Sequence, residues 1–188
     1  MDKKIPYFKY HPDPIKTGGF KITELPIICE CCGLETVIRS VNETAVFVCP
    51  DCIHNGKAYE KFSWGINDIP DWIRDDNVGI VDDNKIDELM CRTPGYPCLQ
   101  HKVWPVHCDD FCAYMGRVHT GDLKRMRIYT KIKTYLREEG AYNEGEYGTA
   151  ERLKKPNGYA EGILYGGCER YLFRCLHCGK YLLHYDYD

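Results

Sequence analysis

Two closely spaced cysteine pairs constrain this chain more than any other feature of its sequence. Cys29 and Cys32 form one C-x-x-C pair, Cys49 and Cys52 form another, and 16 residues separate the pairs. Two thiolates from one tight turn can occupy one side of a tetrahedral ion, and a second such turn completes the coordination. The four cysteines therefore predict a structural zinc site.

Local signals around this site predict a turn, a hairpin and the start of a helix, an arrangement of the treble-clef type. Gly33 follows the first pair, where a tight turn needs a positive φ. Segments 35–41 and 44–48 are rich in β-branched residues and predict the two strands of a hairpin. Pro50 favours the first turn of a helix, which would carry Cys52.

A second zinc site is predicted from two cysteine pairs that lie far apart in the chain: Cys108, Cys112, Cys175 and Cys178. The later pair is followed by Gly179 and so repeats the turn signature of the first site. The earlier pair has i, i+4 spacing, which places both thiols on one face of a helix. Because 62 residues separate Cys112 from Cys175, His107 or Cys168 remain alternative ligands at this site.

The other four of the 12 cysteines are predicted to be free thiols: Cys31, Cys91, Cys98 and Cys168. Cys31 lies inside the first pair and could replace Cys29 or Cys32 as a ligand. The N-terminal residues 1–6 lack the apolar segment of a signal peptide, and no charge-free run is long enough to span a membrane. We therefore expect a cytoplasmic chain, in which reduced thiols bind metal more readily than they form disulfides.

The charge balance disfavours a general nucleic-acid-binding protein. The chain has 25 Lys and Arg residues against 28 Asp and Glu residues, a formal net charge of −3. Nucleic-acid-binding domains usually carry a marked positive excess. One opposing feature is a predicted helix over 120–137, whose polar face is basic: Lys124, Arg125, Arg127, Lys131, Lys133 and Arg137. A zinc-ribbon nucleic-acid-binding protein that uses this helix is therefore the alternative function.

An acidic stretch over 68–88 is the candidate surface for a protein partner. It carries eight carboxylates against only Arg74 and Lys85. The residues proposed to contact the partner are Asp71, Asp75, Asp76, Asp82 and Asp83. Such a surface could occupy the phosphate-binding groove of a basic nuclease toxin and speed association. The alternative is a solvated acidic loop.

Nothing in the sequence matches a known catalytic zinc pattern. A catalytic zinc keeps an open position beside three protein ligands, whereas both predicted sites can be closed by four. The chain has no H-E-x-x-H motif, and its proline follows Cys49 instead of preceding it as in zinc deaminases. A zinc-dependent enzyme is therefore the less favoured alternative. Tyr96, Trp104 and Tyr114 are expected in the core, with a ligand pocket as the other interpretation.

Several segments together resemble the bacterial CbrC family. They run in order from residue 8 to residue 180: Phe8–Pro14, Thr17–Gly18, Cys29–Cys32, Cys49–Ile53, Arg92–Tyr96, His107–Cys112 and Tyr171–Lys180. The resemblance implies a cytoplasmic bacterial protein linked to tolerance of a colicin, a secreted bacterial toxin. It implies no particular reaction.

We therefore predict an α+β fold with two zinc-knuckle or treble-clef-like lobes, short β-hairpins and a few helices. Residues 1–188 are expected to form one CbrC-like domain, with an N-terminal zinc lobe over about 1–88 and a C-terminal zinc lobe over about 89–188. The predicted function is that of a zinc-stabilised binding protein, without catalysis, that contacts another protein in tolerance of or immunity to a toxin. Neither a nucleic acid nor a membrane is an expected partner.

Overall fold

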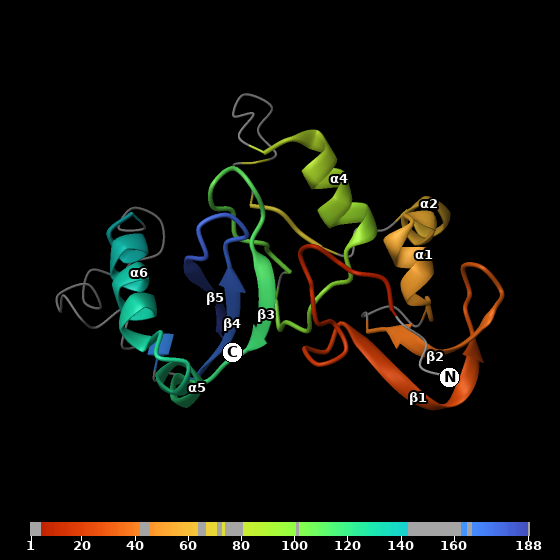
Figure 1. The fold of residues 1–188 in the computed structure, drawn as a ribbon, viewed down its shortest axis with the longest axis horizontal. Coiled ribbons are helices and arrows are strands. Elements are labelled where there is room, and N and C mark those ends of the chain that lie inside the picture. The colour runs from red at the N-terminus through yellow and green to blue at the C-terminus, as the bar shows by residue number, and fades with distance from the viewer. Residues whose placement is uncertain are drawn as a thin grey trace.

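The computed structural model describes residues 5–41, 46–63, 67–70, 73, 81–100, 102–142, 163–164 and 167–187. The fold is α+β, with short antiparallel hairpins and a few helices, as predicted. Figure 1 shows two groups of elements at opposite ends of the long axis, with helix α4 (Asp83–Arg92) between them. No described helix is both long enough and apolar enough to cross a membrane.

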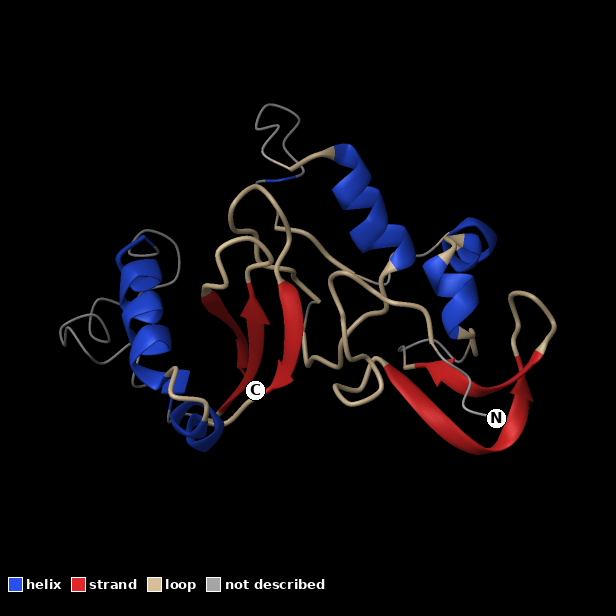
Figure 2. Cartoon of the chain, viewed as in Figure 1, coloured by secondary structure: helices blue, strands red, loops and turns tan. Residues whose placement is uncertain are grey.

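The first group contains a two-stranded antiparallel sheet and two short helices (Figure 2). Strand β1 (Phe20–Ile28) pairs with β2 (Glu35–Ser40). Helices α1 (Pro50–His54) and α2 (Lys57–Phe62) follow, and α1 begins at Pro50 as predicted. Their core consists of Phe8, Phe20, Cys29, Ile38, Val48, Cys49, Cys52, Ile53 and Ala58.

The predicted hairpin of 35–41 with 44–48 is wrong in its partner strand. β2 forms its ladder with β1, and no strand is assigned at 46–48. Ser40 N–H does donate to Val48 O, at 2.9 Å. Residues 42–45 lie outside the described residues. From Thr36 to Ser40, buried and half-buried side chains alternate along β2, and the strand itself was correctly predicted.

The second group is built on a three-stranded antiparallel sheet in the order β3 (Ala113–Arg117), β4 (Cys168–Arg174) and β5 (Tyr181–Tyr187). The β4–β5 pairing runs in register from Cys168↔Tyr187 to Arg174↔Tyr181. The two strands form a hairpin around the last cysteine pair. Because strand side chains alternate, Leu172 and Leu183 lie on one face of the sheet, and Phe173 and Leu182 on the other.

Helices α5 (Thr120–Arg125) and α6 (Tyr129–Tyr142) cover the Leu172 face. The prediction of a single helix over 120–137 is therefore wrong in two respects. The structure has two helices there, and the second one extends past the predicted end at 137 and beyond Gly140. The interruption lies at Arg127, which has φ 58°. Ile128 N–H there donates to Leu123 O at 3.0 Å and closes the first helix.

The opposite face of the sheet packs against an aromatic core. Its largest members are Tyr10, Tyr96, Trp104, Phe111, Tyr114, Tyr171 and Phe173. Tyr96 stacks on Tyr114 with ring centroids 4.6 Å apart. Tyr96, Trp104 and Tyr114 are each at most 1% exposed, which confirms that they belong to the core. Tyr10 joins this core whereas Phe8 joins the first one, so the N-terminal segment contacts both groups.

His11 anchors this segment by burial and two hydrogen bonds. Its side chain is 0% exposed, and Nδ1 lies 2.9 Å from the carbonyl oxygen of Pro94, to which it donates. Nε2 lies 2.6 Å from the hydroxyl oxygen of Thr17, within hydrogen-bond distance. Burial lowers the pKa of His11 from 6.5 to about 4, since a charged imidazolium would lose its hydration.

The His11 pKa makes stability depend on pH in mild acid. Because the folded pKa of about 4 lies below the unfolded value of 6.5, the unfolded chain binds the proton first as the pH falls. We expect His11 to contribute a loss of roughly 3 kcal/mol in the free energy of unfolding between those two pH values. Denaturant unfolding at a series of pH values would measure it.

His11→Gln should flatten this part of the profile, because the amide does not titrate. His54→Gln is the control for loss of an exposed imidazole, since His54 lies on the surface of α1. If the free energy of unfolding falls equally with pH in the parent chain and in His11→Gln, the loss does not come from His11.

Candidate metal centres

The first cluster brings together all four cysteines predicted for the first site. The Sγ atoms of Cys29, Cys32, Cys49 and Cys52 all lie within 4.8 Å of one another. Two of the separations, Cys29 to Cys52 and Cys32 to Cys49, are 3.9 Å. A tetrahedral ion with metal–sulfur bonds of 2.3 Å requires sulfur atoms about 3.8 Å apart. The donor set therefore fits a structural metal site.

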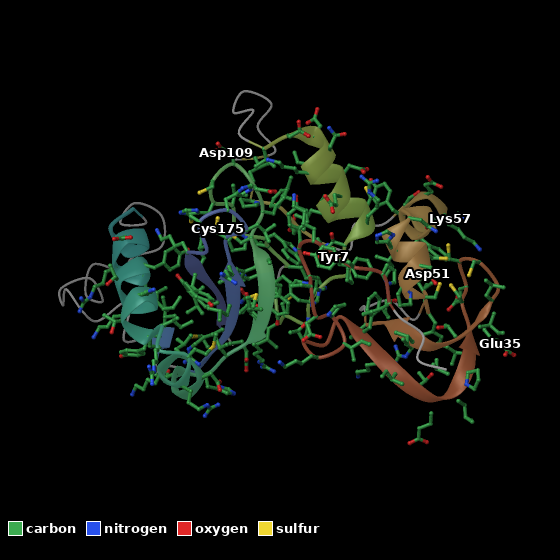
Figure 3. All side chains as sticks on the ribbon, in the orientation of Figure 1. Tyr7, Glu35, Asp51, Lys57, Asp109 and Cys175 are labelled. Atoms are coloured by element: carbon green, nitrogen blue, oxygen red, sulfur yellow. The ribbon has the colours of Figure 1, made fainter. Side chains whose placement is uncertain are left out.

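A tight turn and a helix start position these thiols. In the turn, Gly33 N–H donates to Cys29 O at 2.7 Å, and Cys29 N–H donates to Leu34 O at 2.9 Å. Gly33 has φ 74°, a conformation that glycine adopts without strain. Cys49 is the residue before α1 and Cys52 lies in its first turn. Figure 3 shows Asp51 on α1 and Glu35 at the start of β2 on the two sides of this region.

The thiols of the first cluster differ in their pKa values. Burial raises the pKa of Cys29, but hydrogen bonds from nearby backbone N–H groups outweigh burial and lower it to about 7. Cys49 N–H, for example, lies 3.3 Å from Cys29 Sγ. Burial and the neighbouring thiols raise the pKa of Cys49 to about 11. A cation would stabilise the additional thiolates that this crowded group otherwise disfavours.

The second cluster consists of His107, Cys108, Cys175 and Cys178. Their ligand atoms also lie within 4.8 Å of one another. His107 Nδ1 is 3.1 Å from Cys108 Sγ and 3.5 Å from Cys178 Sγ. A tetrahedral zinc ion would hold sulfur and nitrogen ligands about 3.6 Å apart. Three thiols and one imidazole therefore fit a second structural metal site.

The turn of the second cluster repeats the first one. Gly179 N–H donates to Cys175 O at 3.1 Å, Cys175 N–H donates to Lys180 O at 2.8 Å, and Gly179 has φ 72°. In Figure 3, Cys175 lies beyond the end of β4, at the same end of the sheet as Asp109. Burial raises the pKa of Cys175, but backbone N–H groups of Cys178 and His177 outweigh it and lower it to about 6.

Cys112 does not join the second cluster, and the helix predicted to carry it is absent. Cys108 and Asp109 both have φ 55°, a left-handed conformation that excludes a helical turn. The segment instead makes a tight turn closed by the isolated bridge Val106↔Phe111. The turn brings His107 to the thiols, while Cys112 is 0% exposed within the aromatic core. His107, the alternative ligand weighed above, takes its place.

The other cysteines lie outside both clusters. Cys31 is half-buried beside the first core, and Cys91 and Cys98 are also half-buried. Cys168 is buried, and its thiol lies 3.2 Å from the carbonyl oxygen of Ile163. The structure therefore does not place Cys31 or Cys168 among the ligands.

Comparison with known proteins shows which family the chain belongs to. The family model described as "Uncharacterised protein family (UPF0167)" matches residues 5–187. The chain belongs to the UPF0167 family. It is 30% identical over 195 residues to UPF0167 protein Mb2317 of Mycobacterium bovis, covering 98% of this chain and 95% of that protein. It is 31% identical over 195 residues to UPF0167 protein PA1536 of Pseudomonas aeruginosa, covering 100% of this chain and 99% of that protein. No solved structure matches the chain.

A buried carboxylate supports the second cluster of this UPF0167 protein. Asp110 is 1% exposed, and its Oδ2 lies 3.0 Å from Lys9 Nζ and 3.0 Å from His177 Nε2. Tyr10 OH donates to Oδ1 at 2.7 Å. Burial raises the pKa of Asp110, but these partners outweigh it and lower the pKa. Asp110 thus joins the N-terminal segment to the turn that holds Cys175 and Cys178, a connection that the sequence did not predict.

The proposed acidic surface is only partly described. Asp71, Asp75 and Asp76 lie outside the described residues. Asp82 is exposed and caps α4, accepting from Asn84 N–H at 2.9 Å. Asp83, in the first turn of α4, is exposed as well.

Substitution of His107 and of Cys112 should distinguish the two possible ligand sets of the second cluster. We expect His107→Ala to reduce the metal content from two ions toward one per chain under chelator competition, because one of four ligands is lost. Cys112→Ala should keep both ions and lose only about 1 kcal/mol of stability from core packing. Elemental analysis of the purified proteins measures both. The reverse pattern would reinstate Cys112 as the ligand.

Asp110→Asn should weaken metal binding at the second cluster although no ligand is changed. The amide has one acceptor oxygen, so it cannot accept from Tyr10 and His177 in the present way. Loss of a hydrogen bond to a ligand typically costs about 10- to 100-fold in metal affinity, and we expect a loss of up to about tenfold here because Asp110 holds the turn and not a ligand. Asp109→Asn is the matched control, since Asp109 is exposed and asparagine tolerates its left-handed conformation. Indistinguishable metal affinities for the two variants would exclude this role.

Proposed function

We propose that this UPF0167 protein is a zinc-stabilised binding protein that acts through contacts with another protein. One observation carries the proposal: each cluster offers four protein ligands to one ion. Four ligands leave no open position for water or substrate, which is the arrangement of a structural site. The same closure argues against a zinc-dependent enzyme.

Zinc is the metal that best suits both donor sets. The first cluster offers four thiols, and the second offers three thiols and an imidazole. Sets of this kind, spaced for a tetrahedral ion, favour zinc over hard cations such as magnesium or calcium. When bound, zinc would supply folding energy and hold the two turns in place.

The finer proposal concerns the partner. The sequence motifs resemble the CbrC family, and this resemblance supports a role in tolerance of a protein toxin. The acidic residues at the start of α4, Asp82 and Asp83, are exposed and available to a basic partner. Complementary charge of this kind mainly raises the rate of association.

A cell-survival assay with a colicin tests this role. Replacing Asp71, Asp75, Asp76, Asp82 and Asp83 with Asn should reduce protection several-fold, because the variant lacks the negative charge that attracts the partner. Asparagine retains the capping oxygen at position 82, so helix α4 should remain folded. Glu24→Gln with Glu60→Gln, both exposed on the other group of elements, is the control for loss of carboxylates away from this surface.

Unchanged protection by the acidic-surface variant, at equal metal content and expression, would refute the proposed surface. Nucleic-acid binding is the competing outcome, since α5 and its flanking turn expose Lys124, Arg125 and Arg127. A gel shift on generic DNA or RNA that weakens with salt and disappears when these residues are changed to Ala would favour it.

A further inference from the structure

A groove of about 480 Å³ lies between helix α6 and the turn that follows β4. Its lining combines two lysines, two threonines and two tyrosines: Thr130, Lys131, Thr134, Tyr135, Lys180 and Tyr181. Cavities of roughly 300 to 1,000 Å³ are large enough to hold a small molecule. The groove borders the second metal cluster only at Cys178, and structural metal binding makes no use of its other side chains.

The helical spacing of α6 explains why these residues share one surface. Thr130 and Thr134 are four residues apart, as are Lys131 and Tyr135, so both pairs point from neighbouring rows of the helix toward the same side. Lys180 and Tyr181 approach from the opposite wall, at the end of the turn and the start of β5. In Figure 1, α6 runs beside β5, which places the two walls next to each other.

The cations of the groove are available to an anion. Within the described part of the chain, Lys131 is exposed and makes no ion pair. Lys180 Nζ lies 3.9 Å from Glu138 Oε2, a weak contact between exposed side chains. Thr130 and Lys131 also lie in the first turn of α6, where backbone N–H groups have no acceptor within the helix. These groups add to the positive potential of the two lysines.

The aromatic walls favour a planar group beside the anion. Tyr135 and Tyr181 are both half-buried, so each ring is held by the core while part of it faces the groove. Lys180 Nζ lies 5.6 Å from the centroid of the Tyr135 ring, which places a cation directly beside an aromatic surface. A ligand that carries a phosphate and a flat ring can contact both at once.

We propose that this groove is a binding site for a small molecule with a phosphate group and an aromatic ring, of the mononucleotide class. Lys131 and Lys180 bind the phosphate, the threonine hydroxyls donate to it, and the ring packs against Tyr135 or Tyr181. Glu138 competes with the phosphate for Lys180 and lowers the affinity. The site is independent of the protein-binding role proposed above.

Calorimetric titration of the full, metal-loaded chain with adenosine monophosphate tests the site. Lys131→Ala with Lys180→Ala should lower the affinity at least tenfold, since two charge-assisted contacts are lost. Glu138→Gln should raise it several-fold, because Lys180 is released. Lys16→Ala with Lys21→Ala, which removes two exposed lysines elsewhere, is the matched control.

The ring contact has a separate test. Tyr135→Leu should weaken the binding of adenosine monophosphate but leave the weaker binding of inorganic phosphate unchanged. Tyr135→Phe should bind both ligands as the parent does. Equal metal content in every variant shows that the fold is retained. The proposal is refuted if the parent does not bind at millimolar concentration, if the double lysine variant binds as the parent does, or if only oligonucleotides bind.

Discussion

The convergence of two sets of four ligand atoms, each of which fits a structural metal site, is the constraint on which the rest of the structure depends. In the first group of elements the sheet has two strands, and the helices have five and six residues. Elements this short are marginal on their own, because a single hairpin or a two-turn helix buries little apolar surface. Zinc contributes about 10 to 16 kcal/mol in small zinc-binding peptides, against a net stability of about 5 to 15 kcal/mol for a typical domain. A bound ion of this kind is therefore sufficient to hold these elements together.

The local parts of this design could be predicted from the sequence. A C-x-x-C pair followed by glycine specifies a turn within six residues, and both turns have the predicted positive-φ glycine, Gly33 and Gly179. Pro50 marked the start of α1. In each case the signal and the structure lie within the same short segment, so no knowledge of distant contacts was needed.

The parts that depend on distant contacts could not be predicted in this way. The i, i+4 spacing of Cys108 and Cys112 indicates a helix, but Cys108 is left-handed, in a turn whose Asp110 bonds to the distant residues Tyr10 and His177. Strand β1 was missed because it carries Lys21, Glu24 and Pro26, residues unfavourable to strands, and pairs with β2 across the first cysteine turn. Most side chains of β1 are exposed, so its sequence shows no regular alternation of buried apolar and exposed polar residues that would indicate a strand.

The second turn also links structure to the proposed binding functions. Residues 175–180 hold two metal ligands on one side, while Lys180 faces the groove beside α6. The hydrogen bond from Cys175 N–H to Lys180 O fixes the end of the turn relative to its start. Asp110 in turn holds His177 of the same turn and Tyr10 of the N-terminal segment. A metal ion bound at this cluster would determine where the surrounding side chains lie, and with them the position of the proposed binding groove.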